Sequence, residues 1–101
     1  MDIETIAMSL VGNAGEARSL AFEALHEAKK GEFEKAEELL KKSHKKNLAA
    51  HELQTQLICE EANGNSTEMS LLMVHAQDHL MTSLLARELI NELIDIYKKI
   101  K

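Results

Sequence analysis

Apolar residues recur at steps of three and four positions along most of the chain, and the pattern is interrupted at two places. This spacing puts them on one face of an α-helix, which repeats about every 3.6 residues. In the first segment the pattern comprises Ile3, Ile6, Ala7, Leu10, Ala14, Ala17, Ala21, Ala24, Leu25 and Ala28. The three segments predict three helices of about 25 to 34 residues, each roughly 40 to 50 Å long.

Two short polar stretches mark the ends of these helices. Residues 29–32 read Lys-Lys-Gly-Glu, and lysines followed by glycine commonly end a helix. Asn-Gly at residues 63–64 marks a turn, and Ser66 or Thr67 can cap a third helix that begins at residues 68–69. Because both connections are short, consecutive helices should run antiparallel. We therefore predict an all-α, antiparallel up-down-up three-helix bundle that forms a single domain over residues 1–101.

The third segment is apolar on more than one side. One stripe comprises Leu71, Val74, Met81, Leu85 and Leu89, and further apolar residues extend around the helix at Leu72, Leu80, Leu84, Ile90, Leu93, Ile94, Tyr97 and Ile100. One side can pack in the core of the bundle, whereas the other side needs a further partner. We therefore expect a homo-oligomer.

Composition and charge narrow the classes of function. The formal net charge of -5 argues against a nucleic-acid partner, and the basic run at residues 41–46 is interpreted as a solvated helix face. The single cysteine, Cys59, excludes an intrachain disulfide, and its apolar neighbours predict a packed thiol. No apolar run approaches the roughly 20 residues that span a bilayer, and no basic segment precedes an apolar one. These features predict a cytoplasmic protein that is not inserted in a membrane.

A cluster of polar residues interrupts the third segment at His75, Asp78 and His79. Asp78 falls within the first apolar stripe of that segment, where burying an unpaired carboxylate would be costly. If the stripe lies on an oligomer axis, copies of Asp78 converge, and a divalent cation would relieve their repulsion. The alternative is that Asp78 reaches solvent beside the stripe.

The residue type of His75 allows more than one interpretation. It can be an ordinary hydrogen-bonded side chain, or a nucleophile whose neutral imidazole accepts a phosphoryl group and passes it on. In the second case, Gln77 could donate a hydrogen bond to a phosphoryl oxygen.

A metal site is an alternative interpretation, because His75, Asp78 and His79 are zinc-type ligands. A di-iron site is disfavoured, because such bundles need two Glu-x-x-His pairs and the chain has one, at residues 23–26. The chain contains no nucleotide-binding glycine motif, so no nucleotide is expected.

Residues 73–82, Met-Val-His-Ala-Gln-Asp-His-Leu-Met-Thr, resemble the active-site segment of enzyme IIA of the lactose, cellobiose and chitobiose phosphotransferase systems. Residues 13–19, Asn-Ala-Gly-Glu-Ala-Arg-Ser, resemble the first-helix motif of the same family. Residues 30–36 resemble its first turn. Residues 50–51, 54–55 and 61–64 resemble the end of its second helix. The resemblance covers essentially the whole chain.

This resemblance implies a function and a site. His75 would be phosphorylated at Nε2 by the histidine-containing phosphocarrier protein, and would pass the phosphoryl group to a cysteine of enzyme IIB. Gln77 matches the family's glutamine near the phosphohistidine. Asp78 matches the family's buried aspartate, where three copies meet around a divalent metal, usually magnesium. The resemblance thus implies a homotrimer of three-helix bundles that supports uptake of a β-disaccharide through the membrane component IIC.

Partner docking should use an apolar rim around His75, because a reactive N–P bond must be shielded from water. Leu72, Met73 and Leu80 are the candidates for this rim. The alternative function is a non-catalytic helical adaptor or metal-binding module.

Overall fold

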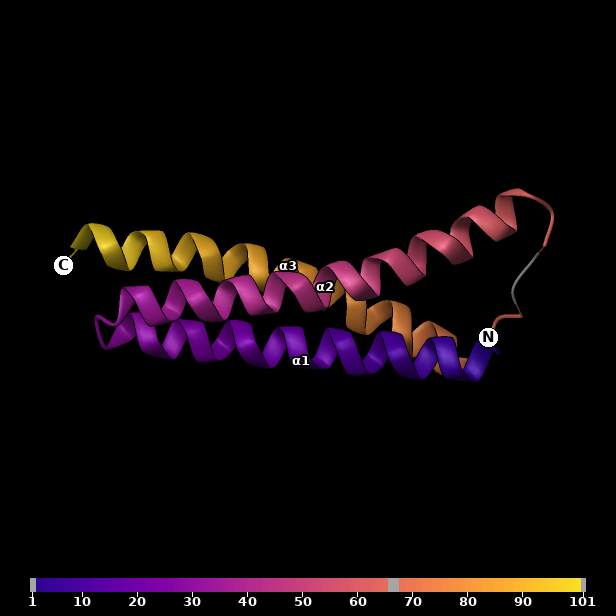
Figure 1. The fold of residues 1–101 in the computed structure, drawn as a ribbon, viewed down its shortest axis with the longest axis horizontal. Coiled ribbons are helices and arrows are strands. Elements are labelled where there is room, and N and C mark those ends of the chain that lie inside the picture. The colour runs from indigo at the N-terminus through magenta and orange to yellow at the C-terminus, as the bar shows by residue number, and fades with distance from the viewer. Residues whose placement is uncertain (1, 66–67, 101) are drawn as a thin grey trace.

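The computed structural model describes residues 2–65 and 68–100 of the 101-residue chain. Three helices follow one another, α1 (Ile3–Lys29), α2 (Phe33–Ala62) and α3 (Leu71–Ile100), with 27, 30 and 30 residues. They lie side by side, with α1 and α3 parallel and α2 in the opposite direction (Figure 1). The prediction of an all-α, up-down-up three-helix bundle is confirmed, and the rod measures 53 × 20 × 19 Å.

The first connection follows the predicted turn chemistry. α1 starts after Asp2, whose carboxylate accepts a hydrogen bond from the backbone N–H of Thr5 at 2.8 Å. α1 ends at Lys29, and Gly31 adopts a φ of 86°, a left-handed conformation that glycine tolerates without strain. The stop predicted at residues 29–32 is therefore confirmed.

α3 begins later than the sequence pattern predicts. Residues 68–70 are not helical, and the first residue of α3 is Leu71. The Ser70 hydroxyl accepts a hydrogen bond from the backbone N–H of Met73 at 3.1 Å, which is the contact of a helix N-cap. The predicted start at residues 68–69 is wrong because Ser70 is the residue that caps the helix. The caps considered at residues 66–67 lie outside the described residues.

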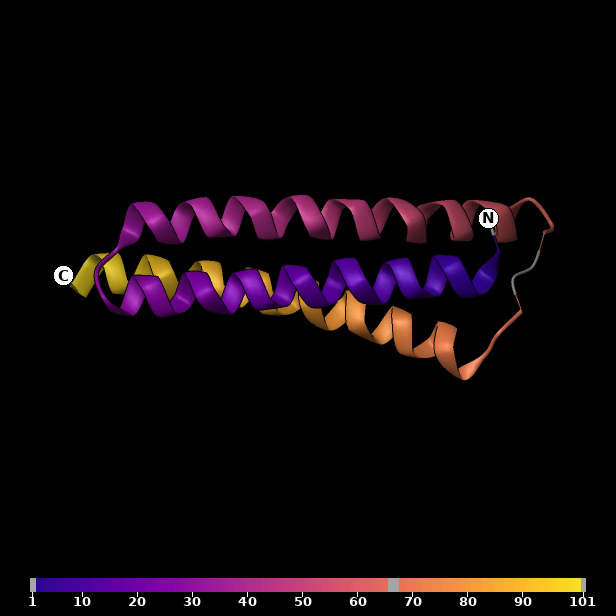
Figure 2. The ribbon, with the colours of Figure 1, turned by 60° about the horizontal axis from the view of Figure 1, so that its bottom comes forward.

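The core is built on an alanine-rich face of α1. The fully buried residues of this face are Ala7, Leu10, Ala14, Ala17, Ala21, Ala24 and Ala28. One cluster joins Leu10 to Ala76 and Leu80 of α3, and a second joins Ala24 to Ile90. Small side chains on α1 let both other helices approach it closely. Towards the end that carries the N-terminus, α2 and α3 diverge from each other along α1 (Figures 1 and 2).

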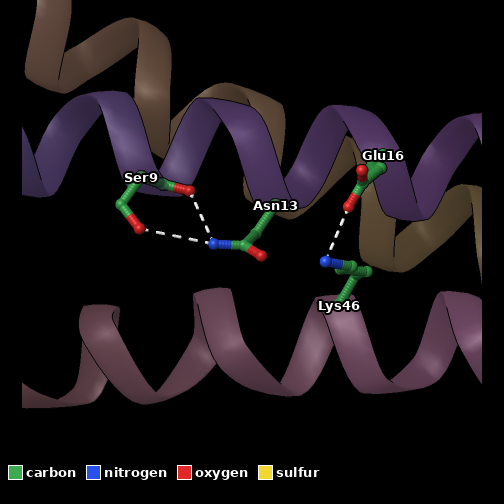
Figure 3. A network of polar contacts seen from close by, with 4 residues as sticks. All are labelled: Ser9, Asn13, Glu16 and Lys46. Carbon is green, nitrogen blue, oxygen red and sulfur yellow. Dashed lines mark hydrogen bonds and ion pairs between the residues drawn. The ribbon is translucent and has the colours of Figure 1, made fainter.

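Polar contacts set the position of α2 along the bundle axis relative to α1. The buried Ser43 hydroxyl donates to the carbonyl oxygen of Ala17 at 2.6 Å, and Lys46 pairs with Glu16 at 2.8 Å (Figure 3). One turn before Glu16, the Asn13 amide donates to the backbone oxygen of Ser9 along the same edge of α1 (Figure 3). The basic run at residues 41–46 is therefore only partly a solvated face.

The second half of α2 is less covered than the first. Cys59 is exposed, so the prediction of a packed thiol is wrong. Its apolar neighbour Ile58 is exposed as well, with an exposed fraction of 60%, because this part of α2 diverges from α3. Over the residues described, the structure contains no helix long and apolar enough to span a membrane.

Candidate functional site

One side of α3 is buried against the other two helices, and the opposite side is exposed. The side that packs on α1 and α2 comprises the buried residues Met73, Ala76, Leu80, Ser83, Ile90 and Ile94, here called the inner face. The opposite side comprises the exposed residues Leu71, Val74, Met81, Leu85, Leu89, Leu93, Ile96 and Ile100, here called the outer face. The exposed fractions of these eight residues range from 41% to 86%. The stripe expected to need a further partner is thus uncovered in the single chain.

Asp78 lies in the middle of the outer face. It is seven residues from both Leu71 and Leu85, and seven residues are about two helical turns, so the three side chains share one line. The Thr82 hydroxyl bonds to the backbone oxygen of Asp78 at 2.8 Å. The Asp78 carboxylate itself is exposed and has no hydrogen bond or ion pair within residues 2–65 and 68–100.

His75 lies at one edge of the outer face, on the side nearer α1. It is exposed, and the ring of His79 lies edge-on against it, with ring centroids 4.4 Å apart and planes at 76°. A shallow hollow beside His75 is lined by Leu71 and Leu72, and Leu72 also borders a hollow shared with Ile3 of α1. The structure thus brings His75 and His79 together beside an apolar surface.

Gln77 lies at the other edge of α3, facing α2. Its side-chain oxygen accepts a hydrogen bond from the Gln54 amide at 2.7 Å, and its own amide lies 3.6 Å from the sulfur of Met73. Two residues along a helix correspond to a rotation of about 200°, so His75 and Gln77 project from different sides of α3. A single chain therefore does not bring Gln77 to His75.

The apolar rim around His75 differs in part from the prediction. Met73 and Leu80 are 1% and 0% exposed, so they belong to the core and their assignment to the rim was wrong. Leu72 is half-buried and does border His75, together with the 86% exposed Leu71. The position of Leu71 two turns before Asp78, on the same stripe, is the sequence signal that identifies it.

A metal site within one chain receives no support. In the part of the chain that the structure describes, no three His, Cys, Asp or Glu side chains gather to hold a metal ion. His75, Asp78 and His79 therefore do not form the zinc-type site considered from their spacing. The carboxylate oxygens of Asp78 are hard donors that suit Mg²⁺, but one chain contributes only one such group. The donor set fits a magnesium ion only if further copies of the chain supply their own Asp78.

Comparison with known proteins gives consistent matches along the chain. The sequence profile of the family described as "PTS system, Lactose/Cellobiose specific IIA subunit" matches residues 5–98. The N,N'-diacetylchitobiose-specific EIIA component of Escherichia coli is 48% identical over 100 residues, covering 99% of this chain and 86% of that protein.

Solved structures agree with this match. A crystal structure of the PTS cellobiose-specific enzyme IIA from Bacillus anthracis has a TM-score of 0.94 and 46% identity, covering 99% of this chain and 93% of that one. IIA(chitobiose) in a solution structure of its complex with HPr, from Escherichia coli, has a TM-score of 0.85 and 46% identity, covering 99% and 97%.

Proposed function

The chain belongs to the lactose/cellobiose-specific IIA family of the sugar phosphotransferase system (PTS), and we propose that it carries a phosphoryl group on His75 between two protein partners. As a IIA component, it is an enzyme of the phosphotransferase system. The observation that carries the proposal is the environment of His75. Its ring is exposed, is flanked by His79 and borders an apolar hollow, so a partner can reach the ring and cover it in the same contact.

The chemistry follows from the properties of imidazole. Nε2 of neutral His75 attacks the phosphorus atom of a phosphohistidine on the donor, and the donor's N–P bond breaks as the new N–P bond forms. In the second transfer, a cysteine thiolate of enzyme IIB attacks the same phosphorus atom. The electron pair of the N–P bond then returns to His75. The chain contributes mainly positioning, and the edge-on ring of His79 restricts rotation of the His75 ring.

Water must be kept away while the phosphoryl group is transferred, because the N–P bond can also be hydrolysed. The hollow lined by Leu71 and Leu72 gives a docked partner an apolar surface to cover beside His75. Excluding water there also strengthens the electrostatic interactions at the phosphoryl group.

The outer face of α3 supports a homotrimer as the working form. Its apolar residues follow steps of three and four, the spacing that packs helices around a common axis. With three parallel copies of α3 at the centre, three Asp78 carboxylates would meet. A divalent cation, for which Mg²⁺ is the natural candidate, would neutralise part of their charge. In this proposal the metal has a structural role.

The trimer would also give Gln77 a role that the single chain does not. His75 and Gln77 lie on opposite edges of the outer face, and rotation about the trimer axis brings opposite edges of neighbouring copies together. Gln77 of one copy would then face His75 of the next, where its amide can donate to a phosphoryl oxygen. The active site would thus lie at the boundary between two subunits.

HPr, the histidine-containing phosphocarrier protein, is the proposed donor, and the cognate enzyme IIB is the proposed acceptor. The similar IIA(chitobiose) of Escherichia coli forms a complex with HPr, which supports the first assignment. Relatives specific for chitobiose and cellobiose support a β-disaccharide as the transported sugar. The sugar would be handled by the membrane component IIC, which this chain serves only through IIB, from the cytoplasm.

Intact-mass spectrometry tests the proposal directly. The purified chain is incubated with phosphoenolpyruvate, enzyme I and HPr, and should gain the mass of one phosphoryl group. His75→Ala should gain none, whereas His26→Ala, at an exposed histidine near the end of α1, serves as the matched control and should still be phosphorylated. Phosphorylation of His75→Ala at the rate of the unmodified chain would refute the assignment.

A further inference from the structure

The edge of α3 that faces α2 carries unpaired carboxylates. Glu88 and Asp95 lie 11 and 18 residues after Gln77, which is about three and five helical turns, so the three residues share one line. Both acidic residues are exposed, and neither forms an ion pair within residues 2–65 and 68–100. We call Glu88 and Asp95 the acidic edge. It continues the edge of the outer face beyond Gln77, towards the C-terminus.

A flank of α1 carries the opposite charge. Arg18 follows Glu16 by two residues, or about 200° around the helix, so it projects away from α2, to which Glu16 is joined through Lys46. Val11, seven residues before Arg18 and on the same line, packs against the core cluster that joins α1 to α3. Lys29 lies 11 residues after Arg18, about three turns, and so belongs to the same flank. Arg18 and Lys29, here called the basic flank, are exposed and form no ion pair with any described residue.

The two sets of charges lie at matching positions along the bundle axis. α1 and α3 run parallel (Figure 1), and two core clusters join them, one towards each end of the bundle. The second cluster ends one residue before a charged residue on each helix, which is Lys29 on α1 and Asp95 on α3. Arg18 and Glu88 each lie in the interval between the two clusters. Each cation of α1 is therefore nearly level with a carboxylate of α3.

Within one chain the acidic edge and the basic flank cannot meet, because the outer face of α3 lies between them. The rotation that places Gln77 of one copy opposite His75 of the next brings opposite edges of the outer face together along their whole length. The basic flank lies beside the edge that carries His75. Because rotation about an axis parallel to the helices leaves positions along that axis unchanged, the acidic edge of one copy then faces the basic flank of the next at the matching level.

We propose that Arg18 and Lys29 of one copy of the chain form ion pairs with Glu88 and Asp95 of the next copy. This inference rests on the trimer proposed above and gives it a second set of contacts besides the apolar outer face. Each chain has a formal net charge of -5, so assembly concentrates negative charge, and these pairs place cations opposite the carboxylates of the acidic edge. They also fix the rotation of each copy relative to the next, which holds the proposed active-site boundary in register.

Cross-linking tests this contact directly. Arg18→Cys and Glu88→Cys are combined in one chain with Cys59→Ser, which removes the natural thiol, and the protein is treated with a short bismaleimide. Because position 18 of each copy faces position 88 of the next, denaturing electrophoresis should show covalent trimers. Glu23→Cys in place of Arg18→Cys is the control and should give almost no covalent product. Glu23 is exposed but lies seven residues after Glu16, so it shares the line of α1 that faces α2.

Exchange of the charges gives a second readout. Arg18→Glu and Glu88→Arg should each raise the concentration at which half of the chains are trimeric by roughly tenfold or more, because each substitution creates a like-charged contact at all three boundaries. The double variant restores opposite charges and should assemble close to normally. Sedimentation equilibrium measures all four proteins.

The outcomes separate this contact from the trimer and from the phosphocarrier function. Trimers of the cysteine variant that give no covalent trimer, or a double charge variant no better assembled than the single ones, would overturn the ion pairs and leave the trimer standing. Monomers of the unmodified chain at all concentrations would overturn both. Phosphorylation of His75 is measured separately by intact mass, so its failure would be seen independently of either result.

Discussion

The inner and outer faces of α3 are both apolar, but they differ in the size of their side chains and in whether their polar residue has a partner. The inner face includes small residues such as Ala76, and its polar residue Ser83 bonds to Asn47 at 2.9 Å. The outer face carries larger aliphatic residues around a carboxylate, Asp78, that has no partner within the described residues. The inner face is complete within one chain. The outer face is not, and contiguous exposed apolar surface of this kind marks an interaction site.

The difference shows how one helix serves two purposes. Close packing against the alanines of α1 stabilises the single bundle and holds α3 in place. The residues that this packing does not use are available for assembly, and His75 lies at their edge. The proposed nucleophile is thus on a helix that packing against α1 holds in place.

The largest effect is expected from a charge introduced on the outer face. Leu85→Asp should abolish the proposed trimer, because assembly would bury an unpaired carboxylate in each subunit at a cost of several kcal/mol, on the order of 3 to 5. Sedimentation velocity should show monomers, with the helical circular dichroism unchanged. Ala49→Asp, on an exposed part of α2, is the control and should assemble normally. An unchanged sedimentation coefficient for Leu85→Asp would rule out the outer face as the interface.

Removing a charge from the outer face should stabilise the proposed trimer. Asp78→Leu should keep the trimer and stabilise it by about 1 to 4 kcal/mol, because it removes converging carboxylates. Thermal unfolding should show a higher midpoint that no longer responds to Mg²⁺ or to a chelator. Dissociation of Asp78→Leu into monomers would mean that the bound metal, rather than apolar packing, holds the assembly together.

The inner face should tolerate added volume poorly. Ala76 is fully buried between α3 and α1, so Ala76→Leu should overpack the core and lower the free energy of unfolding by about 1 to 3 kcal/mol. Ala49→Leu is the same substitution at an exposed position and should change it by no more than about 0.5 kcal/mol. Urea denaturation at matched protein concentration measures both. Equal stabilities would contradict the close packing described for the inner face.

The smallest effect concerns an ion pair far from His75. A hydrogen bond from Lys98 lowers the pKa of the Glu37 carboxyl. Because the folded pKa lies below the unfolded value, the pair contributes stability above the unfolded pKa and loses it as the pH falls through the folded pKa. Lys98→Met should raise the Glu37 pKa in an NMR titration and leave phosphorylation of His75 unchanged. A Glu37 pKa that does not respond would mean that the pair is not formed in solution.

Much of the fold can be predicted from the sequence, because the start and end of a helix depend on residues that are close together in the chain. The alanine spacing of α1 and the glycine after Lys29 each depend on a few neighbouring residues, and both gave correct elements. The start of α3 cannot be predicted from the sequence, because three nearby hydroxyl residues can each act as the cap, and the structure identifies Ser70 as the one that does. The exposure of Cys59 cannot be predicted from its apolar neighbours, because the divergence of α2 from α3 depends on the packing of the whole bundle.

The candidate site is harder to predict from the sequence, because it depends on the side of α3 from which each side chain projects and on contacts with other helices. The spacing of His75 and His79 predicts that they are neighbours on the helix, and their rings do lie against each other. The orientation of Gln77 towards α2 depends on Gln54, which is distant in sequence. Its proposed role opposite His75 requires a second copy of the chain, and no pattern within one segment contains that information.

The central claim is that His75 carries the phosphoryl group, and long-range ¹H–¹⁵N NMR of the phosphorylated protein tests it most directly. The spectra distinguish the two ring nitrogens of each histidine. The account predicts that the phosphoryl group is attached at Nε2 of His75, seen as coupling of that nitrogen to ³¹P. The coupling should persist in His79→Ala and disappear when enzyme IIB is added. A phosphoryl group on His79, or one that enzyme IIB cannot remove, would contradict the account.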